Sequence, residues 1–328
     1  MRPQPIKIPF ETLTPIWTGD AGRKTTYIKE TSIIGGLRFW TEAIIRTLGK
    51  EACNITGDNP CILDKDMEIE DKCGVCQIFG CTGLGKSFSL RIKGNTTPDA
   101  IGDITFPKIP TAKKDPKWYL SDPGRIAPGN NKLEMVIQPV RNLTVAPELL
   151  LSLILMLKWG TLGAKDQFMH GMIKADIDQE LIDRVKEQLS TPLLKSKNGL
   201  KIEDFFFFSA ELKNYDKKIP FQIRYAVRNC LRAERDLRHY FCGVTGNINI
   251  ATKYNIGITK DEKLFGWGYF PKIAVKRNDC LNILLNQIVS HPAIKNPQWR
   301  EFNSDRDTVK KCTDKREYIL YLLEGGWK

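Results

Sequence analysis

Residues Cys73–Lys93 read CGVCQIFGCTGLGKSFSLRIK and contain two patterns that predict different folds. Four positions match the P-loop pattern G-x-x-x-x-G-K-[ST], namely Gly80, Gly85, Lys86 and Ser87. A P-loop requires a helix that begins at the lysine and directs its amino terminus at a nucleotide. The residues from Ser87 to Lys93 instead alternate polar and apolar side chains, which is typical of a strand. The stretch therefore disfavours a P-loop ATPase, which stays as the weaker alternative.

The same stretch opens with a cysteine cluster. Cys73, Cys76 and Cys81 form a C-x2-C-x4-C pattern, and Cys53 and Cys61 precede them in a polar loop. A C-x-x-C turn directs two sulfur atoms at one point, and a structural zinc site needs four ligands. We expect a structural zinc ion with Cys61, Cys73, Cys76 and Cys81 as ligands, and Cys53 as the alternative to Cys61. The other interpretation is a set of ordinary buried thiols.

The composition favours a protein of the cytoplasm with a polyanionic partner. The 328 residues are enough for two domains, and a hydrophobic content of 41% is enough for their cores. The amino-terminal residues contain no apolar signal core, and the run Leu149–Leu157 is shorter than the ~18 to 20 residues of a membrane span. The formal charge of +12 attracts polyanions, of which nucleic acid is the commonest in a cell.

Alternating strand and helix patterns predict an α+β fold. The expected elements are a strand at Ile6–Leu13, a helix at Thr31–Gly49, strands at Phe88–Lys93 and Glu134–Val140, a nearly all-apolar helix between Pro147 and Gly160, and a strand at Ile202–Phe208. An apolar helix of this kind must be buried, so we place it between two domains. The expected domains are residues 1–145, with the cysteine-rich loop and a hairpin insertion at Thr96–Asn131, and residues 146–328.

The segment Trp159–Gly171 reads WGTLGAKDQFMHG and is a candidate contact with RNA. Its glycines, which include Gly160 and Gly163, permit a close approach of backbone to a ligand. Lys165 and Gln167 can reach phosphate and sugar from the same loop. The alternative is a plain turn between domains.

Five arginines in Ile223–Phe241 form the clearest charge pattern of the chain. They are Arg224, Arg228, Arg232, Arg235 and Arg238. Their spacing of four, four, three and three residues places them on one face of a helix. Like charges at this spacing repel one another, so an anion such as RNA along the face would relieve the repulsion. A solvated helix face or contacts with a partner's carboxylates are the alternatives.

Further candidate RNA contacts come from other segments. Arg38 and Arg46 lie on the polar face of the first helix, and Lys86 follows the cysteine cluster. Trp40 and Trp267 can offer flat surfaces on which unpaired bases stack, although the same rings can instead belong to a core.

Four of these segments, taken in order, resemble the RAMP superfamily of CRISPR effector proteins. They are the opening strand with PIWTGD at Pro15–Asp20, TSIIGGLRFW at Thr31–Trp40, CGVCQIFG at Cys73–Gly80, and GTLGAKDQ at Gly160–Gln167. Within that superfamily the chain is most similar to the family of the first RAMP subunit of the Cmr (type III-B) complex. In the last segment Lys165 and Asp166 depart from the more arginine-rich loops of the family.

The resemblance implies two ferredoxin-like (RRM-like) modules with inserted loops, placed near one end of a complex that is built on a guide RNA. It implies guide RNA, target RNA or both as partners, together with other RAMP subunits, and it makes the P-loop match accidental. Related subunits cut RNA with an aspartate in the loop after the first strand, where Asp20 lies here. Because a single carboxylate makes an incomplete nuclease site, we expect no catalytic residues. A ribonuclease that uses Asp20 or His170 is the alternative.

Overall fold

The computed structural model describes residues 4–18, 27–53, 60–94, 133–141, 144–164, 166–189, 195, 197–244, 250–259, 261–272 and 274–326. In chain order the helices are α1 (Glu30–Thr47), α2 (Gly74–Phe79), α3 (Pro147–Trp159), α4 (Gln179–Gln188), α5 (Ile219–Cys230), α6 (Arg235–Cys242), α7 (Arg277–Val289) and α8 (Lys315–Glu324). The strands are β1 (Ile6–Thr12), β2 (Phe88–Lys93), β3 (Leu133–Pro139), β4 (Ile173–Ala175), β5 (Phe205–Leu212), β6 (Tyr254–Ile258), β7 (Lys263–Tyr269) and β8 (Ile294–Glu301). Short 3-10 turns are η1 (Ile69–Asp71), η2 (Asp166–Phe168) and η3 (Ile202–Asp204).

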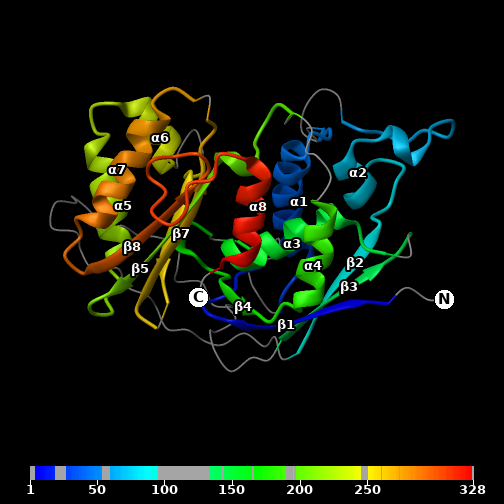
Figure 1. Cartoon of the computed structure of the whole chain (residues 1–328), viewed down its shortest axis with the longest axis horizontal. Helices are drawn as coiled ribbons and strands as arrows, with labels where there is room; N and C mark the ends of the chain where they lie inside the picture. The colour runs from blue at the N-terminus through cyan, green and yellow to red at the C-terminus, as the bar shows by residue number, and fades with distance from the viewer. Residues whose placement is uncertain are drawn as a thin grey trace.

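These elements form two modules of one topology, which lie side by side in Figure 1. Each module runs strand, helix, strand, strand, helix, strand, with one further helix between its first helix and second strand, α2 in the first module and α6 in the second. The sheet orders are β2-β3-β1-β4 and β6-β7-β5-β8, with every pair antiparallel. Both sheets therefore place the first and third strands of the module at their centre. The prediction of an α+β fold with two ferredoxin-like modules is confirmed.

The change from one module to the next falls between β4 and β5. Residues 147–175 contribute α3 and β4 to the first module, where β4 pairs with β1 from Phe10↔Ala175 to Thr12↔Ile173. The boundary expected at residue 145 therefore lies inside the first β-α-β-β-α-β unit. Since α3 is buried on nearly every side, its sequence does not indicate which sheet it covers. The hairpin expected at Thr96–Asn131 lies outside the described residues.

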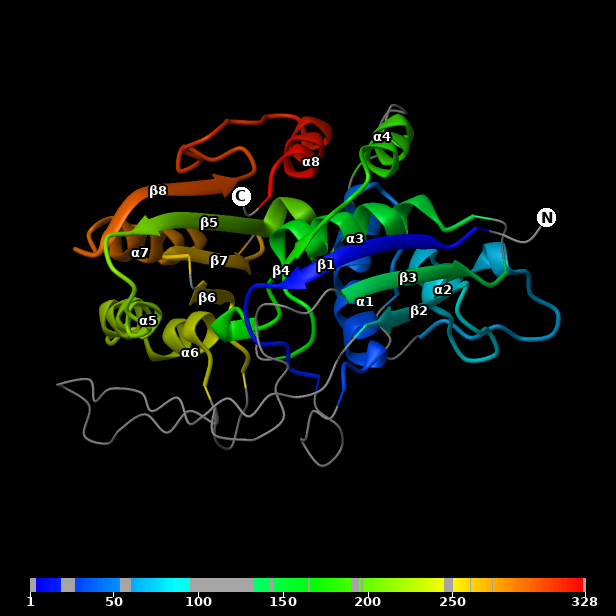
Figure 2. The same cartoon turned by 90° about the horizontal axis from the view of Figure 1, so that it is seen from below.

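The second sheet is buried on both faces, and β5 shows why four consecutive phenylalanines are accommodated there. Phe205 and Phe207 join the core that α1 and α3 share with the second sheet. Phe206 and Phe208 point to the opposite face and join the core beneath α5 and α7. In Figure 2 the strands of the second sheet lie one below another in the order β8, β5, β7 and β6, and α8 and α4 lie on one side of the molecule. Because side chains alternate along a strand, this one strand holds the two cores together.

Trp40 and Trp267 belong to the core between the modules. Trp40 is 2% exposed, and its ring centroid lies 5.0 Å from that of Phe205 and 5.5 Å from that of Trp267. Trp267 is 4% exposed and stacks on Phe205 at 6.1 Å. The expectation that these rings stack on RNA bases is therefore corrected, since neither presents an open face. The alternative interpretation as core residues fits their burial.

The segment after α2 does not form a P-loop. Gly80 ends α2 with φ of +82°, and Cys81 and Leu84 exchange backbone hydrogen bonds in a tight turn. Lys86 is exposed and is followed by β2, so no helix begins at the lysine. The predicted strand is confirmed, and the requirement of a nucleotide-directed helix amino terminus is not met. Among the described residues, no helix has the length and apolar character of a membrane span.

Candidate nucleic-acid interface

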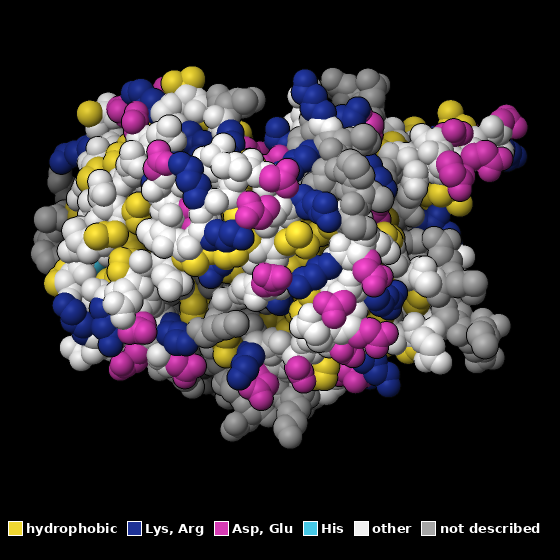
Figure 3. All heavy atoms as spheres, viewed as in Figure 1, with side chains coloured by type: hydrophobic (Ala, Val, Ile, Leu, Met, Phe, Trp, Pro, Cys, Tyr) yellow, Lys and Arg dark blue, Asp and Glu magenta, His cyan; other side chains and the backbone are white. Residues whose placement is uncertain are grey.

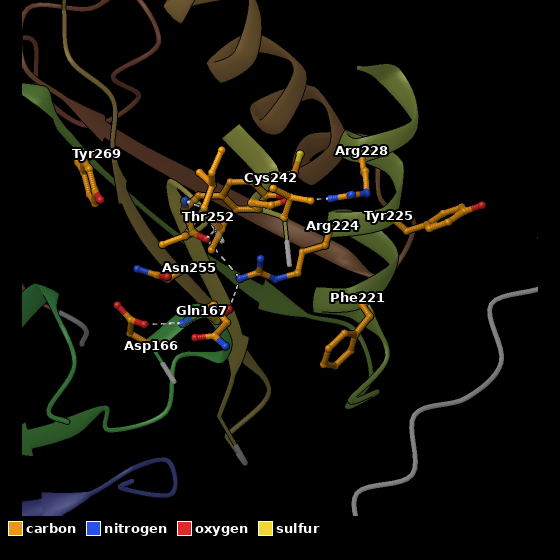
Figure 4. A pocket seen from close by; sticks show the side chains of 15 residues that line it. Asp166, Gln167, Phe221, Arg224, Tyr225, Arg228, Cys242, Thr252, Asn255 and Tyr269 are labelled. Atoms are coloured by element: carbon orange, nitrogen blue, oxygen red, sulfur yellow. Dashed lines mark hydrogen bonds between the residues drawn. The ribbon is translucent and has the colours of Figure 1, made fainter. Parts of the chain in front are cut away.

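The glycine-rich segment Trp159–Gly171 and the start of the arginine row on α5 meet at a cavity between the two modules. The cavity measures about 560 Å³, and we call it the intermodule pocket. Asp166 and Gln167 of η2 line it from the first module, and Arg224 and Arg228 of α5 line it from the second, with Asn255 of β6 between them. Figure 4 shows the side chains of both modules around this space. Two of the segments chosen from the sequence are thus adjacent in the fold.

Arg224 ties the two modules together at this pocket. Its Nη2 donates to the backbone carbonyl of Gln167 and, at 3.3 Å, to that of Tyr254. The guanidinium lies 5.0 Å from the centroid of the Tyr254 ring and 5.8 Å from that of Phe168. Within the described part of the chain, its buried Nε has no hydrogen-bond partner. Burial lowers the pKa of Arg224 from its usual value, so the site holds a poorly solvated cation.

Asp166 is a carboxyl group whose charge acts on this cation. Burial raises the pKa of Asp166, while the backbone amide of Gln167, 3.0 Å from its Oδ1, and the charge of Arg224 oppose the rise. The carboxyl group is therefore held to the η2 turn and partly balances the arginine. Asp166 is one of the two positions at which this loop departs from the arginine-rich pattern, and here it places an acidic group on one wall of the pocket.

The glycines of the loop serve packing within the protein. Gly163 has φ of +93°, and a Cβ there would lie 2.4 Å from the carbonyl oxygen of Trp17. Gly171 has φ of +83°, and a Cβ there would lie 1.9 Å from the carbonyl oxygen of Leu162. A Cβ on Gly160 would lie 2.9 Å from the Trp40 ring. Gly163 thus lets the loop lie against the chain that follows β1, whereas Gly171 and Gly160 let it approach Leu162 and Trp40. The sequence suggested a close approach of this backbone to a ligand, but the atoms that these glycines approach are backbone and core atoms of the protein itself.

The arginine row continues from the pocket onto α6 and forms what we call the basic surface, made of Arg228, Arg232, Arg235 and Arg238. The row does not lie on one continuous helix, because α5 ends at Cys230 and α6 begins at Arg235. Arg232 and Arg235 are exposed. Arg228 donates from Nη1 to the carbonyl of Gly243 at 3.0 Å. The expected single helix is therefore corrected to two, joined by a turn.

The basic surface keeps its positive charge. Among the residues that the structure describes, no carboxylate forms an ion pair with Arg228, Arg232, Arg235 or Arg238. Partial desolvation and the charges of Arg238, Arg235 and Arg228 lower the pKa of His239, which indicates a positive potential there. The face of the molecule that Figure 3 shows has no such uniform charge, because Lys and Arg are intermingled there with Asp and Glu.

The other candidate cations are placed elsewhere. On α1, Arg38 and Arg46 share Glu42, with nitrogen–oxygen distances of 3.2 Å and 3.4 Å. Both side chains are mostly buried, at 16% and 12% exposure. Lys86 is exposed in the chain between α2 and β2. Lys165 and Asp20 lie outside the described residues. The α1 arginines therefore have partners within the protein.

His170, the alternative catalytic residue, is 6% exposed. Its ring lies edge-on to that of Phe168, with centroids 6.1 Å apart. His291 lies in the second module, where Nε2 contacts Oε1 of Gln222 at 3.0 Å. A histidine that water scarcely reaches is poorly placed to exchange protons with a polymer substrate.

Four cysteines come together in the first module. The sulfur atoms of Cys53, Cys61, Cys73 and Cys76 lie within 4.8 Å of one another and could hold a metal ion. Cys81 is not a member of this group, so that predicted ligand is wrong and Cys53 takes its place. The reason is local, because Gly80 ends α2 and the next residue enters the tight turn with Leu84. Burial raises the pKa of Cys76, whereas at Cys73 hydrogen bonds from neighbours outweigh burial and lower the pKa.

Comparisons with known proteins agree with this architecture. The family model described as "RAMP superfamily" matches residues 9–237. Comparison with curated proteins finds no match. The crystal structure of Cmr1 from Pyrococcus furiosus in its apo form aligns with a TM-score of 0.50 at 12% identity, over 87% of this chain and 97% of that one. A chain of the type III-B Cmr-beta complex bound to cognate target RNA aligns with a TM-score of 0.48 at 10% identity, over 88% of this chain and 100% of that one.

The similarity to Cmr1 concerns the fold, which in both chains spans nearly the full length. The family match covers the first module and continues through α5, and so includes the glycine-rich segment and most of the arginine row. On the paired β-α-β-β-α-β modules and this match, the chain is a member of the RAMP superfamily.

Proposed function

We propose that this chain is an RNA-binding, non-catalytic subunit of a type III-B (Cmr) CRISPR effector complex. The observation that carries the proposal is the basic surface: four arginines, of which Arg228 lines a cavity between two RRM-like modules, with no carboxylate paired to them in the described part of the chain. Membership of the RAMP superfamily and a fold similar to Cmr1 support the assignment to an effector complex. Its partners are then guide RNA, target RNA or both, and other RAMP subunits.

Charge explains why a polyanion suits this surface. Arg232 and Arg235 are exposed and follow one another around the turn between α5 and α6. Like charges at such spacing repel, and phosphates placed between them convert repulsion into attraction while releasing counterions. The planar guanidinium group also donates two parallel hydrogen bonds to a phosphate. Phosphate contact of this kind positions a strand without reading its sequence.

The test is the salt dependence of binding to single-stranded RNA. The double variant Arg228→Gln/Arg232→Gln should weaken binding to unrelated sequences alike. If each arginine neutralises one phosphate, the slope of log affinity against log salt becomes shallower by about 1.4, at about 0.7 per phosphate. The matched control is Arg184→Gln, because Arg184 is an exposed arginine on α4 of the first module. An unchanged affinity and slope in the double variant would remove the basic surface from the binding site.

We also propose that the ion held by the four cysteines is zinc in a closed structural site. Four thiolate ligands favour zinc over magnesium or calcium, which prefer oxygen ligands. Cys53, Cys61, Cys73 and Cys76 come from three stretches of chain, so one ion would join the end of α1, the following loop and α2. With four protein ligands, no position is left for water or substrate, which fits a structural role.

A further inference from the structure

The cysteine cluster is supported on one side by Arg38 of α1. Nη2 of Arg38 lies 3.8 Å from Sγ of Cys76, and Nε donates to Oε1 of Glu42 at 3.2 Å. The guanidinium carbon lies 5.7 Å from the centroid of the Phe79 ring, so the planar group rests against α2. With the side chain 16% exposed, little of this arginine faces solvent. Its donors are thus directed at a sulfur atom and a carboxylate of the same module.

The distances between the sulfur atoms fit a tetrahedral centre. With metal–sulfur bonds of about 2.3 Å, the sulfur atoms of a tetrahedral zinc site lie about 3.8 Å apart. Here Sγ of Cys53 and Sγ of Cys76 are 3.4 Å apart, and all four atoms lie within 4.8 Å. The backbone N–H of Cys53 also donates to Sγ of Cys73 at 3.3 Å. Small shifts would therefore bring the four sulfur atoms to bonding positions around one ion.

A centre of this kind carries excess negative charge. Four thiolates around one divalent ion leave a net charge of −2, and partial burial makes that charge costly unless it is paired or hydrogen-bonded. Arg38 is the cation whose guanidinium contacts a ligand sulfur, and N–H···S contacts to ligating sulfurs are the outer interactions that tune such sites. Glu42 holds the guanidinium in place from one turn further along α1.

We propose that Arg38 is a positioning residue of a zinc centre formed by Cys53, Cys61, Cys73 and Cys76, whose guanidinium offsets the charge of the thiolates and orients Cys76. The inference rests on the proposed zinc ion and refines it. The proposed ligand set includes Cys53 and excludes Cys81, and Arg38 is assigned to the metal site instead of to RNA. The centre then anchors α1 to α2 and to the loop between them.

The experiment measures metal content and affinity in the full chain and its variants. Purified protein should carry one zinc ion per chain, and Co²⁺ in its place should give the absorption of a tetrahedral thiolate site. Cys81→Ser should keep the ion, whereas Cys53→Ser should lose it or bind it much more weakly. Loss of metal in Cys81→Ser, or a Cys53–Cys76 disulfide without metal in fresh protein, would overturn the ligand set.

Arg38 is tested by competition for zinc with a chelator. Arg38→Gln should lower zinc affinity by about tenfold to a hundredfold, as loss of an outer partner does at other zinc sites. Arg38→Lys should restore part of the affinity, because it keeps the charge without the planar fork. The control is Arg91→Gln, since Arg91 is exposed on β2 of the same module. Zinc bound normally in Arg38→Gln overturns the role of Arg38 alone, whereas a wild-type chain without metal overturns the zinc proposal itself.

Discussion

Replacement of Trp40 should destabilise the protein without changing the affinity of the folded molecule for RNA. Trp40 is 2% exposed and contacts rings of the second sheet, so Trp40→Ala removes a contact between the modules as well as filling of the core. A buried aromatic side chain removes about 150–250 Å² from water, which at about 25 cal/mol per Å² is worth about 4–6 kcal/mol as an upper bound. Measured Trp→Ala losses of about 3–5 kcal/mol agree with this range.

The assay is guanidinium denaturation followed by circular dichroism, together with RNA binding of the folded fraction. Since a loss of this size can consume much of a typical domain stability of about 5–15 kcal/mol, Trp40→Phe serves as the milder variant with a loss of the same sign. Arg232→Gln is the reciprocal control, because Arg232 is exposed and its replacement should weaken RNA binding with little change in the denaturation midpoint. The core assignment is refuted if Trp40→Phe keeps wild-type stability but loses RNA affinity.

Two further predictions concern single positions. Gly171→Ala should lower the free energy of unfolding by about 1–3 kcal/mol, because φ is +83° and the new Cβ would lie 1.9 Å from a carbonyl oxygen. The control is Gly35→Ala, which should not lower the thermal midpoint, because nothing lies within 4 Å of the added Cβ. Glu301→Gln should lower the free energy of unfolding by about 3–5 kcal/mol at neutral pH, because Arg277 and Arg306 both lose their ion pair with the buried carboxylate. Burial acts to raise the pKa of Glu301, but hydrogen bonds from Arg306 and the charge of Arg277 hold it below the usual value. The wild-type advantage should therefore be full above the unfolded-state pKa and disappear as pH falls through the folded pKa; a difference independent of pH would contradict it.

Local patterns were sufficient to place most elements of the fold. The strand expected at Ile6–Leu13 is β1 at Ile6–Thr12, and the helix expected between Pro147 and Gly160 is α3 at Pro147–Trp159. Periodicity does not say which sheet a strand joins, however. β4 has three residues and pairs with β1 from more than 150 positions away, so the module boundary was misplaced.

The candidate site shows the same limit. Arg224 and Gln167 were each chosen from local sequence, but their contact spans 57 positions and follows from the packing of two modules. Tyr254 and Asn255, which complete the pocket, carry no signal in the sequence that sets them apart from other strand residues. Cys53 was expected only as the alternative to Cys61, and Cys81 was chosen because it continues the C-x2-C-x4-C pattern. The turn after Gly80 takes Cys81 out of the group, and both Cys53 and Cys61 belong to it.

The most direct test of the proposed function is RNA–protein crosslinking in the reconstituted effector complex, with crosslinks mapped to residues. The account predicts crosslinks in α5, α6 and the turn η2, around the intermodule pocket. Crosslinks confined to the outer face of the first sheet, on β1, β2 and β3, or none on this chain, would contradict it.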